Sequence, residues 1–265
     1  MKIGILYICT GKYSIFWKDF FESCERFFLP QIEKKYYVFT DASDIQNTNN
    51  IKTYYKQSKG FPYDSLLRFD MFIEIEEDTK ECDYVFFFNS NMEFKKVITP
   101  DMFLPTAEDN GLLGVLHPGY YNKKHPWFLP YEKKKSSTAY IKNVKGETYH
   151  YFMGGVNGGT HEAFYRLSHD CSKQIKKDLD NNCMAIYHDE SQINQYFHNK
   201  KIKILPPSFG SFEDGEFSFK PYIIIRNKVK YGGKSFDKLP QTAYIQRIKR
   251  RIKELYRNIL WILNF

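Results

Sequence analysis

The chain has 265 residues, which suits one large domain or two small ones and is long enough to bury a core without disulfide staples. Aromatic residues make up 18% of it, which excludes a disordered chain. The sequence contains no run of about 18 apolar residues, so it predicts no membrane-spanning helix.

The net charge limits the kinds of partner to expect, and the cysteine content indicates the redox compartment. The 39 basic and 31 acidic residues give a net charge of +8, which favours an anionic partner: a nucleotide, a nucleic acid or a membrane surface. The five cysteines are scattered without a C-x-x-C pair, so we expect no disulfide framework, no zinc knuckle and a reducing, cytoplasmic setting. The short apolar stretch before Lys12 predicts a strand and not a signal peptide.

Strand and helix patterns alternate over the first ninety residues. Apolar runs and helical spacings predict, in turn, a strand at 2–8, a helix at 13–28, a strand at 36–40, a helix at 63–77 and a strand at 83–88. This rhythm is typical of a doubly wound α/β protein with a parallel sheet.

Beyond residue 100 the pattern is looser. It predicts a strand at 111–116, a basic loop at 123–137, a strand at 149–157 that two glycines interrupt, helices at 160–179 and 189–199, and a short strand at 202–205. A further helix begins after Pro240.

Ligands of a parallel sheet bind beyond the carboxyl ends of its strands, which draws attention to the segments 9–13, 40–41 and 89–91. In the first, Gly11 permits close backbone approach and Tyr13 offers a ring for stacking on a base. An ordinary strand-to-helix turn with a core tyrosine is the alternative interpretation.

The triplet Asn89-Ser90-Asn91 stands where many sugar-nucleotide enzymes carry Asp-x-Asp, whose carboxylates hold a divalent cation. An asparagine is neutral and offers one carbonyl oxygen, so it is a poorer ligand for a hard metal. The triplet therefore predicts weak metal binding or none, and a simple polar turn is the alternative.

Acidic residues and glycines supply two further candidates. Asp189 and Glu190 begin a predicted helix, whose dipole stabilises negative charge, although Asp189 could be a simple N-cap. The glycine pairs at 154–155 and 158–159 allow a ligand to approach the backbone, or mark bulges.

Taken together, five motifs resemble glycosyltransferase family 6, the family of the histo-blood-group A and B transferases, the α1,3-galactosyltransferase and the Forssman synthase. The similarity runs from about residue 3 to about residue 234. In chain order the motifs are Cys9-Thr10-Gly11-Lys12-Tyr13, Tyr36-Tyr37-Val38-Phe39-Thr40-Asp41, Leu116-His117-Pro118-Gly119, Gly154-Gly155 with Gly158-Gly159, and His188-Asp189-Glu190-Ser191. The neutral triplet and the absence of a membrane stem resemble the bacterial, metal-independent branch.

The resemblance implies a GT-A fold: one Rossmann-like nucleotide-sugar-binding domain over 1–240 with a mixed central sheet. It implies a retaining α1,3-glycosyltransferase in which Glu190 is the catalytic carboxylate, as nucleophile or as stabiliser of an oxocarbenium ion. His117 matches an acceptor contact, and Tyr187 stands where many relatives have an acceptor-stacking tryptophan. The implied donor contacts are Thr10, Tyr13, Arg68, Asn89, Asn91, Met153, Gly154, Gly155 and Asp189.

Without a metal, fixed cations have to stabilise the leaving diphosphate, so we expect activity in EDTA and no cofactor. The candidates are Arg68 and the basic segment Arg226, Lys228, Lys230 and Lys234, whose lysines could equally be solvated surface. Gly155 leaves space for an N-acetyl group and favours UDP-GalNAc over UDP-Gal, whereas Met153 points the other way by analogy. The expected acceptor is an oligosaccharide with a terminal β-galactose, 2-fucosylated as in the H antigen.

Residues 241–265 are predicted to form a separate unit, a basic amphipathic helix, because their apolar residues are spaced alternately three and four apart. Such a helix suits an anionic membrane surface and predicts a peripheral position on the inner face of a bacterial membrane. Docking on its own domain and a dimeric coiled coil are the alternatives.

Two competing functions remain. A basic nucleic-acid-binding protein would explain the charge and the aromatic rings, but not motifs in family order, so we expect no nucleic-acid partner. Another GT-A transferase, with a different donor sugar or an inverting outcome, is the closer alternative.

Overall fold

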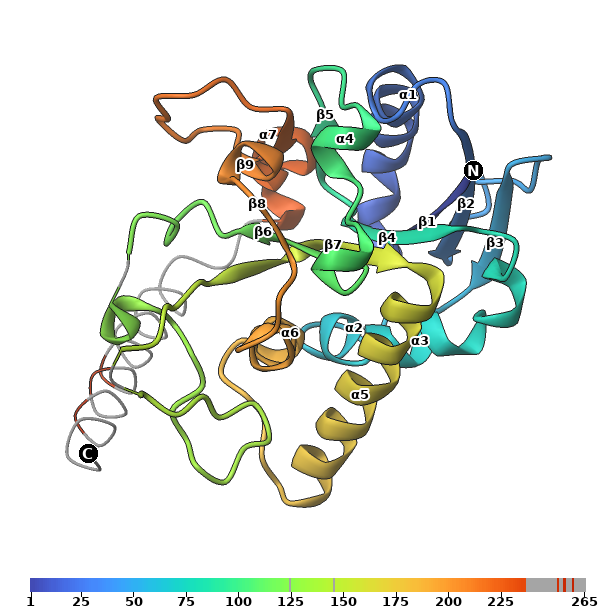
Figure 1. Ribbon diagram of the computed structural model, residues 1–265. Helices are drawn as coiled ribbons and strands as arrows, with labels where there is room; N and C mark the ends of the chain where they lie inside the picture. Colours follow the sequence, from blue (N-terminus) through green and yellow to red (C-terminus); the bar gives the residue numbers. More distant parts are fainter. Residues whose placement is uncertain (124, 145, 237–251, 253–254, 256–258, 260–265) are drawn as a thin grey trace.

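The computed structural model describes residues 1–123, 125–144 and 146–236, together with 252, 255 and 259. Within these residues a seven-stranded mixed sheet forms the centre, and a three-stranded sheet lies beside it. Figure 1 shows α1 and α4 on one side of the large sheet and α2, α3, α5 and α6 on the other. The expected α/β class with a mixed central sheet is confirmed, and the architecture is GT-A-like.

The large sheet has the strand order β3-β2-β1-β4-β7-β6-β8. Strands β1 to β4 run parallel, β7 is antiparallel to both β4 and β6, and β8 is parallel to β6. The strands are β1 (Lys2–Ile8), β2 (Glu33–Thr40), β3 (Ile51–Tyr55), β4 (Tyr84–Asn89), β6 (Leu112–Leu116), β7 (Phe152–Thr160) and β8 (Lys203–Leu205). The small sheet pairs β5 (Met92–Phe94), β10 (Ile223–Ile225) and β9 (Ser211–Phe212).

The helices follow the predicted positions with local differences. The α-helices are α1 (Trp17–Phe27), α2 (Tyr63–Leu66), α3 (Arg68–Glu74), α4 (Pro100–Phe103), α5 (His161–Asp180), α6 (His188–Phe197) and α7 (Lys228–Gly232). Short 3-10 turns are η1 (Gly11–Phe16), η2 (Glu77–Thr79), η3 (Ala107–Asp109), η4 (Pro126–Phe128), η5 (Pro207–Phe209) and η6 (Gly233–Phe236). The single helix predicted at 63–77 is wrong, because the chain breaks at Leu67 into α2 and α3.

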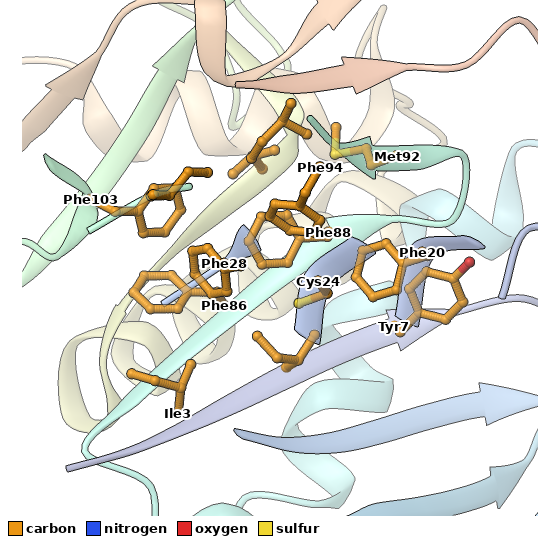
Figure 2. Packing of buried hydrophobic residues seen from close by; sticks show 14 of the residues in the cluster. Ile3, Tyr7, Phe20, Cys24, Phe28, Phe86, Phe88, Met92, Phe94 and Phe103 are labelled. Carbon is orange, nitrogen blue, oxygen red and sulfur yellow. The ribbon is translucent and has the colours of Figure 1, made fainter. Parts of the chain in front are cut away.

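The apolar run of β4 explains why this strand lies at the centre. Phe86 and Phe88 point to the α1 side, whereas Phe87 packs on the α3 and α5 side, so both faces are buried. On the α1 side the ring of Phe28 lies 4.9 Å from that of Phe103 and 5.3 Å from that of Phe88 (Figure 2). Each such edge-to-face pair adds about 1 kcal/mol to simple burial.

The glycines of β7 divide into two groups. A Cβ on Gly158 would lie 2.3 Å from the Val85 carbonyl oxygen, and one on Gly159 would lie 1.9 Å from that of Gly111. These two glycines therefore let three strands approach closely, and their role is structural. Further along, the pairing with β6 shifts from Gly114–Asn157 to Leu116–Phe152, so residues 153–155 form an irregularity in the ladder, as strands often do beside a site.

The predicted C-terminal helix lies mostly outside the described residues, as does the boundary near 240. Ile252, Leu255 and Ile259 are described, and all three are helical and exposed. Among the helices that are described, none combines the length and the apolar character needed to cross a bilayer.

Candidate active site

A pocket opens where β1 and β4 end side by side. In the strand order, β2 lies on one side of β1 and β4 on the other, so the chain connections diverge here and leave a crevice. The residues that line the pocket are Ile8, Thr10, Tyr13, Phe61, Asp64, Ser65, Arg68, Phe87, Asn89, Ser90, Asn91 and Lys228. The structure thus brings together six of the expected donor-binding residues, which lie far apart in the sequence.

One end of the pocket is formed by Tyr13 and Lys228. The Lys228 Nζ donates to the Tyr13 hydroxyl at 3.2 Å and lies 4.7 Å from the centre of its ring. The ring of Phe236, from η6, meets the Tyr13 ring edge-on at 5.1 Å. Thr10 is buried just after β1, and the Gly11 N–H beside it donates to Asp41 Oδ1 at 2.6 Å, which fixes the turn. Sequence reasoning missed Phe236.

The two asparagines of the neutral triplet have different positions. Both line the pocket, Asn89 at the end of β4 and Asn91 in a buried position from which its Nδ2 donates to the Arg226 carbonyl at 2.8 Å. The Arg226 N–H returns a bond to the Asn91 carbonyl, also at 2.8 Å. A carboxylate at position 91 could not donate to a carbonyl oxygen, so this contact requires the amide.

The basic residues between 226 and 234 differ in their position relative to the pocket. Lys230 forms ion pairs with Asp214 and, at 3.8 Å, with Glu213, away from the pocket lining. Lys234 belongs to η6. Arg226 is anchored by Asp19, whose Oδ2 lies 2.6 Å from its Nη1. Among the side chains of this segment that the structure describes, Lys228 lines the pocket.

A buried ion pair involves Arg68, which lines the pocket. Arg68 Nη1 lies 2.9 Å from Asp189 Oδ2, and the two side chains are only 3% and 9% exposed. Arg68 also donates from Nη2 to the Gly154 carbonyl at 2.8 Å, and Asn157 donates to the same oxygen at 3.0 Å. Burial raises the pKa of Asp189 and lowers that of Arg68, while the charge of each partner opposes the shift of the other.

Glu190 lies next to this pair and is held by two neutral donors. The Tyr151 hydroxyl donates to its Oε1 at 2.6 Å, and the Gly154 N–H donates to its Oε2 at 2.7 Å. Burial raises the pKa of Tyr151 well above its ordinary value, so its hydroxyl keeps the proton that it donates. A Cβ on Gly154 would come within 3.1 Å of the Glu190 Cβ, which explains the glycine there.

Helix α6 carries both carboxylates, and β7 fixes its position. The Asn194 side chain makes two bonds with the Phe152 backbone, each of 2.8 Å, and a third of 2.8 Å to the Glu190 carbonyl. At the start of the helix, Tyr187 donates its N–H to Ser191 Oγ at 3.0 Å. Sequence reasoning missed Asn194, Asn157 and Tyr151, because no motif signals such contacts.

The donor contacts expected at 153–155 lie beside Asn89. A Cβ on Gly155 would lie 2.8 Å from Asn89 Nδ2 and 3.0 Å from the methyl groups of both Met153 and Met92. The space expected over Gly155 is therefore already filled by the ends of these three side chains, and Met153 itself is buried. These ends can shift more readily than backbone can.

His117 lies beside the carboxylate through Tyr151. The backbone N–H of His117 donates to the backbone carbonyl of Tyr151 at 2.9 Å, and the centres of the two rings lie 5.8 Å apart. Burial lowers the pKa of His117 to about 4, so the ring is neutral at pH 7. Because Nδ1 accepts from the Gly119 N–H at 3.0 Å, the proton of the neutral ring is on Nε2, which is a donor. Tyr187 is half-buried one helical turn before Ser191.

These features define the class. A crevice at the switch point of a doubly wound sheet is lined by an aromatic ring and two cations, and one of these, Arg68, pairs with a carboxylate of α6. This is the arrangement of a GT-A-type glycosyltransferase. Residues 1–218 match the family model described as "Glycosyltransferase family 6". The chain belongs to this family, as the motifs had indicated.

Relatives in bacteria and animals agree with this assignment. The chain is 35% identical over 236 residues to "O-antigen biosynthesis glycosyltransferase WbnI" of Escherichia coli, covering 86% of the chain and 95% of that protein. It is 29% identical over 219 residues to "Globoside alpha-1,3-N-acetylgalactosaminyltransferase 1" of Homo sapiens and 28% identical over 221 residues to "Histo-blood group ABO system transferase 1" of Rattus norvegicus. These matches cover 79% and 78% of the chain and 60% of each animal protein, so the chain spans about three fifths of their length.

Proposed function

We propose that the protein is a retaining α1,3-glycosyltransferase that moves GalNAc, or Gal, from a UDP-sugar to a terminal β-galactose, 2-fucosylated as in the H antigen. The observation that carries the proposal is the placement of Glu190, whose carboxylate is fixed by Tyr151 and Gly154 beside the Arg68–Asp189 pair. The printed name of the human relative, an α1,3-N-acetylgalactosaminyltransferase, supports the same bond and sugar.

The chemistry follows from charge. When the bond between the anomeric carbon and the diphosphate oxygen breaks, its electron pair leaves with UDP and the sugar becomes positive. Glu190 then stabilises the anomeric carbon, directly or as a transient ester, while the acceptor O3 attacks and its proton leaves with the diphosphate or with solvent. A glycosidase needs a second carboxyl group as an acid, whereas UDP leaves without strong protonation, so one carboxylate can suffice.

We propose further that fixed cations replace a metal ion at the diphosphate. Lys228 and Arg68 line the pocket together with Asn89, and Asn91 is held by the Arg226 backbone. A lysine ammonium and a guanidinium supply permanent positive charge where other transferases use a metal. Full turnover in excess EDTA is expected, and loss of turnover that Mn²⁺ restores would contradict this part of the proposal.

The preferred donor is UDP-GalNAc. The neighbours of Gly155 are the ends of Asn89, Met153 and Met92, which can move to admit an N-acetyl group. Competition between UDP-Gal and UDP-GalNAc in one assay tests the preference, and selective use of UDP-Gal would refute it.

The central experiment is a screen of UDP-sugars against lactose and 2′-fucosyllactose, with Glu190→Gln as a near-isosteric control. We expect UDP release with the native protein and a loss of at least about hundredfold in kcat for the variant. The anomeric proton of the product, measured by NMR, distinguishes retention from the inverting alternative. An unchanged rate in Glu190→Gln would exclude the assigned role.

We also propose that the helix predicted at 241–265 holds the enzyme on an anionic membrane, at the inner face in a bacterium. Ile252, Leu255 and Ile259 are exposed and spaced three and four residues apart, which aligns them on one helical face. Sedimentation with anionic liposomes, with and without residues 241–265, is the test. Equal sedimentation of both proteins would contradict this proposal.

A further inference from the structure

Four aromatic side chains form a partly exposed surface next to the acceptor side of the site. We call Tyr121, Phe212, Phe217 and Phe219 the aromatic patch. Phe217 and Phe219 stack with ring centres 5.0 Å apart, and the Tyr121 ring meets Phe219 edge-on at 6.2 Å. The patch joins two segments that are about 90 residues apart in the sequence, one following β6 and the other following β9, which lie on the same side of the molecule (Figure 1).

The patch is continuous with the catalytic carboxylate. Tyr151 donates to Glu190 at 2.6 Å, the His117 ring lies 5.8 Å from Tyr151, and the Phe212 ring lies 5.9 Å from His117. A tight turn closed by the bond from the Gly215 N–H to the Phe212 carbonyl, at 3.0 Å, then leads to the rest of the patch. A series of ring contacts thus leads from Tyr151 to Phe212, and the turn after Phe212 carries the chain on to Phe217 and Phe219.

The rings are held in place without being buried. Phe212 is 42% exposed and Tyr121 39% exposed. Phe217 lies against Gly215, where a Cβ would come within 2.3 Å of the ring Cε2, so a larger residue at position 215 would displace the ring. Glu216, Ser218 and Lys220 alternate with the two phenylalanines and are exposed. Exposed, fixed aromatic rings beside polar side chains are typical of a recognition surface.

We propose that the aromatic patch binds the sugar units of the acceptor that follow its terminal galactose, so that the enzyme prefers chains longer than a disaccharide. This inference rests on the proposed function. The face of a pyranose ring presents C–H groups, which carry partial positive charge and stack on the negative face of an aromatic ring. Its hydroxyl groups at the edge need polar partners, which the alternating residues supply. Continuity with Glu190 favours acceptor sugars as the occupant.

Saturation-transfer NMR on the full chain, with UDP present, tests this directly and needs no turnover. The probes are lactose and lacto-N-neotetraose, which both end in a β-galactose. We expect saturation to reach the inner N-acetylglucosamine and galactose protons of the tetrasaccharide, and its affinity to exceed that of lactose. Saturation confined to the terminal galactose, or equal affinity for the two probes, would overturn the inference.

Two variants locate the effect. Phe219→Ala and Tyr121→Ala are each expected to weaken tetrasaccharide binding about three- to tenfold, the scale of one lost ring contact, and to leave lactose binding unchanged. Tyr55→Ala is the matched control, since Tyr55 is exposed on β3 at the opposite edge of the sheet. Equal losses for both probes, or a native dimer that Phe219→Ala dissociates, would refute an acceptor subsite.

Separate measurements test the proposed function and the aromatic patch. UDP release from UDP-GalNAc reports on the transfer step, whereas the NMR signals report on the aromatic patch alone. Tetrasaccharide binding that depends on Phe219 without any UDP release would refute the transferase proposal and support the subsite. UDP release with equal KM values for lactose and the tetrasaccharide would support the transferase proposal and refute the subsite.

Discussion

The exchange Arg68→Met tests whether the buried ion pair holds the crevice together. The methionine fills much of the same space, but Asp189 loses the partner 2.9 Å away and the Gly154 carbonyl loses one of its donors. A buried charge left without its partner costs about 3–5 kcal/mol. For a chain of this size each kcal/mol lowers Tm by about 2–4 °C, so we expect Tm to fall by about 10 °C.

The pH dependence of this loss follows from Asp189. Burial raises its pKa in the native protein, and Arg68 opposes that shift. Without Arg68 the native pKa lies further above the unfolded value of about 3.9. An acid whose native pKa is raised binds more protons when folded, so lowering the pH stabilises the folded state. The difference in the free energy of unfolding between the native protein and Arg68→Met should therefore become smaller as the pH falls from 7 to 4.

A double-mutant cycle identifies the cause. Asp189→Asn removes the charge, so adding it to Arg68→Met should recover stability, with a coupling of about 2–3 kcal/mol in urea denaturation. Circular dichroism at several urea concentrations gives the four free energies of unfolding. Effects of the two substitutions that add within about 0.5 kcal/mol would refute the reasoning, because independent sites behave in that way.

Three further predictions concern the neighbouring groups. Tyr151→Phe removes a hydrogen-bond donor to Glu190, so kcat should fall about ten- to hundredfold with little change in the donor KM. An unaltered kcat would show that this bond is dispensable. Lys228→Ala should raise the KM for the UDP-sugar about tenfold, whereas Lys230→Ala, which alters a surface ion pair, should leave it unchanged; equal effects would contradict the assignment. Burial lowers the pKa of His117 to about 4, so the ring is neutral above that pH and charged below it. The acceptor KM should therefore stay constant from pH 8 to pH 5 and rise only near pH 4. A rise near pH 6.5, the ordinary pKa of histidine, would contradict the assignment of His117 as a neutral acceptor contact.

The sequence predicts the long buried elements well because their periodicity is strong. The apolar run of β4 and the four-residue spacing of α5 are clear signals, since both elements bury continuous faces. Strand β3 was missed because it is an edge strand with half-exposed residues. Strands β5, β9 and β10 have three, two and three residues, which is too short to establish an alternation.

The candidate site was predictable where motifs fall at the ends of strands, as at Thr10 and Asn89. The supporting contacts were not, because each joins residues distant in sequence. Tyr151 reaches Glu190 across 39 residues, and Asn194 reaches Phe152 across 42. Such pairs depend on how β7 and α6 pack together, and no local pattern records that packing.

Gly154 has a consequence for how such an enzyme could change its donor. Its N–H fixes Glu190, and its carbonyl receives both Arg68 and Asn157. Gly154, which has no side chain, therefore connects Arg68, for which we propose a role in donor binding, to Glu190, for which we propose a role at the anomeric carbon. A substitution that moves Gly154 would shift both Arg68 and Glu190. A change of donor sugar in evolution should therefore be accompanied by compensating substitutions on α6.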